Sequence, residues 1–337
     1  MDLAAAVLQG DRLALARLLT GIENEDPRGL DALSELYPSG GQADRIGVTG
    51  PPGCGKSSLV ARLGAHIRRH GLRPGTGPVK VAVVAVDPSS PFTGGAILGD
   101  RIRMRDLAGD PGVFIRSMAS RGALGGLARA TFGTVQALDA AGYAVILIET
   151  VGAGQAEVEI ARTAHTTLVV EAPGMGDDVQ AIKAGILEIA DILVVNKADL
   201  PGAENAMRQL RAALALGYPA QNDGHHPPEA QAGKLPAGVP GWVPEVLPTS
   251  AFKDTGVPDL IDAIARHLAH LDTSGSREAL ERRRALSEVE ALLEQRLVEW
   301  FHAKLAEEDL QAAVRLVVER RISPRQAVGR LTAELAP

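Results

Sequence analysis

The stretch with the clearest chemical meaning is the octapeptide Gly-Pro-Pro-Gly-Cys-Gly-Lys-Ser, which runs from Gly50 to Ser57. It fits the pattern G-x-x-x-x-G-K-S/T between an apolar run and a helical pattern, which is the context of a phosphate-binding loop. In such a loop, glycines let successive backbone N–H groups point at one anion, and the helix N-terminus adds partial positive charge. Lys56 reaches the terminal phosphates, and the Ser57 hydroxyl binds Mg²⁺. The sequence therefore predicts a nucleoside-triphosphate site formed by Gly50, Pro51, Pro52, Gly53, Cys54, Gly55, Lys56, Ser57 and Ser58.

A second motif, Asn196-Lys197-Ala198-Asp199, directly follows a short apolar run. The Asp199 carboxylate can accept hydrogen bonds from the N1–H and 2-amino groups of guanine, an arrangement that adenine does not offer. We expect Asn196 to tie this motif to the phosphate loop, and the stem of Lys197 to cover the base. Further along, a backbone N–H at Ser250 or Ala251 is suited to meet guanine O6. These residues predict that the nucleotide is GTP or GDP.

Acidic residues at predicted strand ends are candidates for a metal site beside the phosphate loop. Glu149 closes one apolar run, Asp87 closes another, and Asp100 lies in the Gly-rich stretch that follows Asp87. Carboxylate oxygens suit Mg²⁺, and parallel strands bring their carboxyl ends to one edge of a sheet. A turn or helix-capping role is the alternative for Asp87. We predict Mg²⁺ ligands at Ser57, Asp87, Asp100 and Glu149.

Hydrolysis also needs groups that hold the γ-phosphate and orient the attacking water. Gly152 can donate its N–H to the γ-phosphate. Ala153 follows it where a water-positioning Gln would be useful, so Gln155 can serve only if its loop brings it inward. The predicted catalytic residues are Lys56, Glu149 and Gln155. Because positioning of the water dominates this chemistry, we expect slow intrinsic hydrolysis that awaits a partner.

The elements that must position these residues alternate along the chain between residues 45 and 270. Runs that are apolar on both faces and alternate with helical patterns predict an α/β fold, with a mostly parallel sheet covered by helices on both faces. Ligands are then expected at the carboxyl ends of the strands, where the motifs lie. The predicted strands are 46–48, 79–86, 113–117, 143–149, 167–170, 192–195 and 246–247.

Both ends of the chain are predicted to be helical, and we divide it into an N-terminal helical extension (1–40), a nucleotide domain (41–272) and a C-terminal helical arm (273–337). Pro27 is expected to break the first segment into separate helices. In the arm, one helical face is apolar. That face can pack back on the body or contact a partner subunit. It carries Leu286, Val289, Leu293, Leu297 and Trp300.

Composition narrows the class of protein. The chain has 337 residues, 45% hydrophobic and 23% charged, which is ordinary for a globular protein with a sizeable core. Its net charge of −6 gives no reason to expect nucleic-acid binding, and no apolar run is long enough to span a membrane. The N-terminus lacks a signal-peptide pattern, so we expect a cytoplasmic protein. The pair His225-His226, in a Pro- and Gly-rich stretch, is weak evidence for a metal.

Four further stretches are more specific than the phosphate loop. Together they closely resemble the MeaB/ArgK/MMAA family of P-loop GTPases, and the resemblance covers roughly residues 40–270. The stretches are DPSSPFTGG with LGDR (87–101), RSMASRG (116–122), ETVGAGQ (149–155) and PGMGDDVQAIKAG (173–185).

The resemblance implies a G protein of the SIMIBI type that binds GTP and Mg²⁺ and forms a homodimer through its C-terminal arm. It also implies a chaperone for an adenosylcobalamin-dependent acyl-CoA mutase, above all methylmalonyl-CoA mutase. GTP binding and hydrolysis would gate the loading of adenosylcobalamin or the removal of damaged cofactor. A segment at 174–183 resembles the family's switch toward the mutase, with Asp177, Gln180 and Lys183 as polar contacts.

Three alternatives stay open. One is a kinase or ATPase linked to basic amino-acid transport, although Asp199 argues against ATP. Another is a GTPase that inserts nickel, which needs imidazole or thiolate ligands in placed clusters that a single cysteine and two loop histidines do not supply. The third is a nucleotide-gated binding module with negligible turnover.

Overall fold

The structure is a computed structural model of the chain. It describes residues 2–73, 75–88, 104, 107, 109–120, 126–150, 160–174, 188–217 and 241–333. The chain forms two compact units, Met1–Ala279 and Leu280–Pro337, and each is described by itself.

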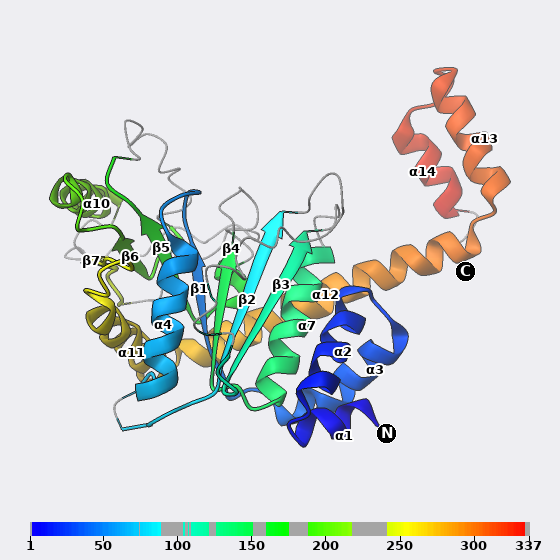
Figure 1. Cartoon of the computed structure of the whole chain (residues 1–337). Coiled ribbons are helices and arrows are strands. Elements are labelled where there is room, and N and C mark those ends of the chain that lie inside the picture. Colours follow the sequence, from blue (N-terminus) through cyan, green and yellow to red (C-terminus); the bar gives the residue numbers. More distant parts are fainter. Residues whose placement is uncertain are drawn as a thin grey trace. The chain divides into compact units, whose positions relative to one another are not determined.

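The first unit is built on a seven-stranded sheet (Figure 1). The strand order is β3-β2-β4-β1-β5-β6-β7, and every pairing among these strands is parallel. The α/β prediction of a mostly parallel sheet is therefore confirmed. The strands are β1 (Asp44–Thr49), β2 (Val81–Pro88), β3 (Val113–Ser120), β4 (Val145–Thr150), β5 (Thr166–Glu171), β6 (Ile192–Val195) and β7 (Glu245–Pro248).

Helices cover both faces of this sheet, as the doubly apolar strands require. On one face, α7 (Gly126–Ala140) shares a core cluster with Ile146 and Ile148 of β4. On the other face lies α4 (Lys56–His70), where a Cβ on Gly64 would contact Leu147 at 3.6 Å. Helix α11 (Val257–Ser274) packs beside α4, and α10 (Ala203–Gly217) packs against β6 and β7.

Three N-terminal helices join the cluster beside α7 (Figure 1). They are α1 (Leu3–Leu8), α2 (Arg12–Glu23) and α3 (Pro27–Leu36), followed by the 3₁₀ turn η1 (Tyr37–Ser39). Pro27 starts α3, which confirms the predicted break between helices. Helices α2 and α3 approach so closely that a Cβ on Gly29 would lie 2.9 Å from the backbone of Gly21. The predicted boundary at residue 40 stays a prediction.

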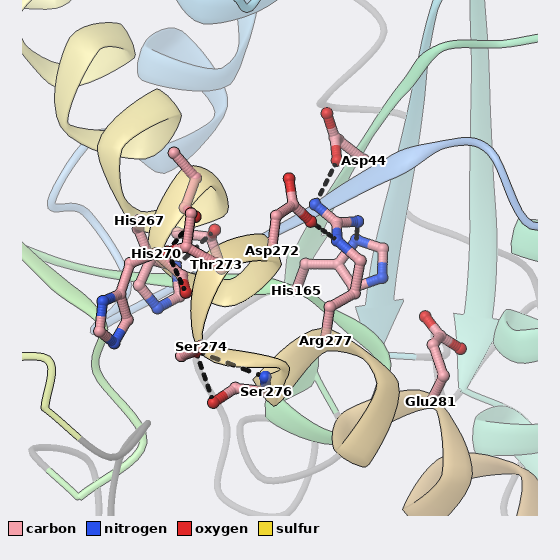
Figure 2. A network of polar contacts seen from close by, with 12 residues as sticks. Asp44, His165, His267, His270, Asp272, Thr273, Ser274, Ser276, Arg277 and Glu281 are labelled. Atoms are coloured by element: carbon pink, nitrogen blue, oxygen red, sulfur yellow. Dashed lines mark hydrogen bonds and ion pairs between the residues drawn. The ribbon is translucent and has the colours of Figure 1, made fainter.

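The first turn of α12 (Ser276–Lys304) is fixed by ion pairs that Figure 2 shows from close by. Arg277 donates to Asp44 Oδ1 at 2.9 Å and to Asp272 Oδ1 at 2.5 Å. Arg73 donates to the same two carboxylates over 3.1 to 3.3 Å. Two arginines and two aspartates therefore join the start of β1, the segment after α4, the last turn of α11 and the first turn of α12.

The second unit contains the rest of α12, with α13 (Glu307–Val318) and α14 (Pro324–Ala333) packed on each other. Ala327 and Leu331 of α14 are buried, whereas the apolar side chains predicted to form one face of α12 are exposed in the single chain. Within the described part of the chain, no helix is both long and apolar enough to cross a membrane.

Candidate nucleotide site

The phosphate loop leads from β1 into α4 at the centre of the sheet. Gly50, Gly53 and Gly55 all have positive φ angles, of 140°, 83° and 92°. A Cβ at Gly50 would collide with the Val170 carbonyl oxygen of the neighbouring strand β5. These glycines are therefore required by the path of the loop. Helix α4 begins at Lys56 with Gly55 as its N-cap residue, which directs its first N–H groups toward the loop.

The Lys56 side chain folds back over this loop. Its Nζ donates to the carbonyl oxygens of Gly50 at 2.8 Å and Pro51 at 3.0 Å, and the residue is buried. A buried ammonium group needs such acceptors, since desolvation of an unpaired charge is expensive. The loop thus holds the lysine at its rim, within reach of an anion that occupies the cradle.

Ser57 and Glu149 meet at the same place. The Ser57 hydroxyl donates to Glu149 Oε1 at 2.6 Å, and both residues are buried. Glu149 lies opposite Val48 in the register of β4 and β1, which brings it beside the start of the phosphate loop. A hydroxyl and a carboxylate in this arrangement form the kind of oxygen donor set that suits Mg²⁺.

Of the other two predicted metal ligands, the structure describes the backbone position of Asp87 but not Asp100. Asp87 lies in β2, one strand away from Glu149, where its backbone pairs with Ala119 of β3. Asp100 lies outside the described residues. Among the residues described, no group of three or more His, Cys, Asp or Glu side chains is arranged to hold a metal ion. Among the side chains that the structure describes, those of Ser57 and Glu149 are brought together by a direct contact.

Asn196 connects the base-recognition motif to two other loops. Its Nδ2 donates to the carbonyl oxygens of Cys54 at 2.9 Å and Gly55 at 3.3 Å. Its Oδ1 accepts from the Thr249 hydroxyl at 3.2 Å and the Ala251 N–H at 3.1 Å. One buried amide therefore fixes the phosphate loop and both loops expected to read the base.

Lys197 and Asp199, the two residues expected to contact the base, are each held by a hydrogen bond to a neighbouring loop. Lys197 Nζ donates to the Gly53 carbonyl at 2.8 Å, so its stem crosses the gap between the two loops. Asp199 Oδ1 accepts from the Ser250 hydroxyl at 2.6 Å, and this hydrogen bond holds the pKa of the Asp199 carboxyl below its usual range. At neutral pH this carboxylate is ionised and able to accept from guanine.

Cys54 fills space in the loop. Burial raises the pKa of its thiol to about 11, so the group is neutral at physiological pH and unreactive. Cys54 therefore contributes a small, buried and neutral side chain to the loop.

The remaining predicted residues lie outside the described part of the chain. They are Asp100, Gly152, Gln155, Asp177, Gln180, Lys183, His225 and His226. Sequence reasoning also missed two described contacts beside the site. Thr150 donates to the Thr49 hydroxyl at 3.1 Å, and Arg62 donates to the Ala251 carbonyl at 3.0 Å.

Comparisons with known proteins identify the family. The family model described as methylmalonyl Co-A mutase-associated GTPase MeaB matches residues 15–306. A putative GTPase of Pyrococcus abyssi is 42% identical over 334 residues, covering 99% of this chain and 96% of the relative. The GTPase ArgK of Escherichia coli is 36% identical over 332 residues, covering 96% and 93%.

Two further matches extend the comparison. The mitochondrial methylmalonic aciduria type A homolog of Caenorhabditis elegans is 32% identical over 294 residues, covering 83% of this chain and 67% of the relative. A crystal structure of a LAO/AO transport system kinase superposes with a TM-score of 0.70 at 27% identity, covering 99% and 96% of the two chains. The chain has the P-loop GTPase fold, binds guanine nucleotide and belongs to the MeaB family of GTPases.

Proposed function

We propose that this GTPase is a chaperone of an adenosylcobalamin-dependent acyl-CoA mutase of the methylmalonyl-CoA mutase type. The observation that carries the proposal is the match to the mutase-associated GTPase family, which extends over residues 15–306. That match includes every nucleotide motif and all of α12. In this proposal the nucleotide state gates the loading of adenosylcobalamin onto the mutase, and the protection or reactivation of a damaged enzyme.

The proposed nucleotide chemistry follows from the contacts around α4. Backbone N–H groups of Gly53 to Ser58 cradle the phosphates, and Lys56 exchanges its carbonyl partners for phosphate oxygens. Ser57 and Glu149 would hold Mg²⁺, which supplies positive charge to the β- and γ-phosphates when bound. Asp199 accepts hydrogen bonds from the Watson–Crick edge of guanine. We also propose that the Gly152 N–H donates to the γ-phosphate and that Gln155 orients the attacking water.

We further propose that the C-terminal arm makes a homodimer. The supporting feature is the row of apolar side chains on α12, which are exposed in the single chain and recur at spacings of three and four. Such a row is typical of a helix that packs on another helix. The segment from 174 to 183, with Asp177, Gln180 and Lys183, stays our proposed switch toward the mutase.

A kinase role remains the second candidate, because the solved structure with a TM-score of 0.70 carries that description. The two roles differ in nucleotide and product. Turnover is measured with a panel of nucleoside triphosphates. A strong preference for GTP, with release of inorganic phosphate and no phosphorylated acceptor, supports the GTPase chaperone over the kinase. Phosphate transfer to a protein or amino-acid transport component supports the kinase.

The chaperone proposal is tested by binding to purified methylmalonyl-CoA mutase with GDP and with a non-hydrolysable GTP analogue. We expect the affinity of the GTPase for the mutase to differ between the GDP-bound and the GTP-analogue-bound state. A nucleotide can control the mutase only if the mutase binds the two states with different affinity. Equal affinity in both states, or no complex with any cobalamin-dependent acyl-CoA mutase, contradicts the proposal. The Lys56→Ala variant serves as a control that cannot respond to the nucleotide.

A further inference from the structure

The loop that follows β7 contains a backbone donor beside Ser250 and Ala251 that the described residues do not use. Four of the five N–H groups from Thr249 to Lys253 donate hydrogen bonds within the described part of the chain, and the fifth, that of Phe252, has no hydrogen-bond partner there. The four that are used donate from Thr249 to Val195 O (2.9 Å), from Ser250 to Thr255 O (2.9 Å), from Ala251 to Asn196 Oδ1 (3.1 Å) and from Lys253 to Ser250 Oγ (3.1 Å).

This unused donor belongs to a peptide group that Arg62 holds from behind. Arg62 Nε donates to the Ala251 carbonyl oxygen at 3.0 Å. That carbonyl and the Phe252 N–H are the two ends of one planar trans amide, so they point in opposite directions. A charged donor on the oxygen polarises the amide and strengthens its N–H as a donor. Arg62 therefore both aims and activates the Phe252 N–H.

A second contact from the same helix face fixes the far end of the loop. His66, one turn after Arg62 on α4, places its Nε2 3.3 Å from both carboxylate oxygens of Asp254. Asp254 has a φ angle of 55°, and Ser250 and Thr255 close the loop through a reciprocal pair of backbone hydrogen bonds. The loop is thus held as a rigid turn against the helix that begins in the phosphate loop.

The Phe252 N–H lies in the loop that also supplies Ser250 to Asp199. The Ser250 hydroxyl donates to Asp199 at 2.6 Å, and Lys253 Nζ lies 4.0 Å from the other oxygen of that carboxylate. A guanine whose N1–H and 2-amino groups face Asp199 presents its O6 on the neighbouring edge, toward this loop. Adenine presents a 6-amino donor at the same position, which cannot accept from an N–H.

We propose that Arg62 is a specificity-determining positioning residue, which holds the Ala251–Phe252 amide so that the Phe252 N–H donates to guanine O6. This inference rests on the proposed placement of the base against Asp199. It assigns the O6 contact to Phe252, because the Ala251 N–H is already bound by Asn196. It also makes phosphate binding and base recognition parts of one rigid element, since both are organised by α4.

The test separates recognition of O6 from recognition of the 2-amino group. Arg62→Met keeps the apolar stem and removes the donor, and Arg69→Met removes an exposed arginine from the same helix as a matched control. Dissociation constants are measured for GDP, for 6-thio-GDP, whose sulfur is a weak acceptor in place of O6, and for IDP, which lacks the 2-amino group. Thermal unfolding checks that each variant is folded, and Arg62→Gln replaces Arg62→Met if the latter does not fold.

The wild-type chain and Arg69→Met should prefer GDP over 6-thio-GDP by about tenfold, a typical cost of weakening one buried hydrogen bond. In Arg62→Met this preference should fall to about twofold through weaker binding of GDP, while the preference for GDP over IDP is unchanged. An unchanged preference over 6-thio-GDP overturns the proposal. A parallel loss of both preferences also overturns it, since that result means general loosening of the site. If wild-type protein shows no preference over IDP, the placement of the base against Asp199 is wrong instead.

Discussion

The Ser57 hydroxyl and the Glu149 carboxylate are joined by a buried 2.6 Å hydrogen bond, which connects the first turn of α4 to the end of β4. Strand β4 is the neighbour of β1, which carries the phosphate loop, so the contact arises directly from the strand order. A metal that takes the Ser57 hydroxyl as a ligand must share this carboxylate or displace it. The pair is therefore the point at which Mg²⁺ binding and loop geometry are coupled.

Glu149→Gln should weaken Mg²⁺ binding by about 10- to 100-fold, because the amide keeps the shape of the side chain but loses its charge. The measurement is the Mg²⁺ concentration that half-saturates GTP hydrolysis. Glu204→Gln on the exposed side of α10 is the matched control. An unchanged Mg²⁺ requirement would remove Glu149 from the metal site.

Asp199→Asn should shift the preference of the site from GTP toward XTP. The amide cannot accept from both guanine donors, whereas its NH₂ group can donate to the 2-oxo group of xanthine. The shift is measured as the ratio of the dissociation constants for the two nucleotides. Full retention of GTP affinity would show that Asp199 does not read the base.

His267 should make the protein less stable in mild acid. Burial, with the positive charges of His270, His165 and Arg277 as smaller causes, lowers the pKa of His267 to about 3. Asp191 Oδ1, 3.3 Å from Nε2, favours the charged form, but complete burial outweighs it. In the unfolded chain this histidine takes up a proton with a pKa near 6.5, whereas in the folded chain it stays neutral until about pH 3. The contribution of neutral His267 to the free energy of unfolding is therefore fully present above about pH 6.5. Below that pH it falls by about 1.4 kcal/mol per pH unit, down to about pH 3.

Denaturant unfolding at pH 7 and pH 5 measures this slope. The His267→Gln variant should lose less stability between the two pH values than wild-type protein, by about 2 kcal/mol. His70→Gln at the exposed end of α4 should behave like wild type. Equal slopes for His267→Gln and wild type would mean that His267 is protonated in the folded chain.

Arg277→Met should destabilise the first unit by about 2 kcal/mol, because it leaves Asp44 and Asp272 with only one of their two arginines. The Asp44 side chain is mostly buried, so water compensates poorly for the lost partner. The measurement is the free energy of unfolding. Arg283→Met, an exposed position of the same helix, is the control, and an equal effect of the two variants would rule out the network as the cause.

Leu293→Arg should convert the proposed homodimer to a monomer, because the charge enters the middle of the apolar row on α12. Light scattering after size exclusion gives the mass of each species. Glu294→Arg, at the next exposed position, should stay dimeric. A wild-type chain that is monomeric at micromolar concentration would refute the dimer.

Much of the fold was predictable because each strand is apolar on both faces. The pattern placed β1, β4 and β6 within two residues of their observed ends. Motifs at strand ends were likewise predictable, since parallel strands bring their carboxyl ends together. This explains why Ser57 and Glu149, 92 residues apart in the chain, meet as a pair.

Contacts made by helix surfaces were not predictable in this way. Arg62 is one of several arginines on α4, and its role depends on where the loop after β7 lies 189 residues later. The Arg277 network likewise joins segments that share no local pattern. Sequence periodicity reports which face of a helix is apolar but does not report which distant carbonyl or carboxylate meets a polar side chain at its edge.

GTP turnover with and without purified methylmalonyl-CoA mutase tests the central proposal most directly. We predict that the mutase raises the hydrolysis rate at least about tenfold, since a partner that completes the site accelerates a slow GTPase strongly. Lys56→Ala should show no such rise. A rate that is unchanged by stoichiometric mutase, while GTP binding is intact, would contradict the account of this GTPase as a mutase chaperone.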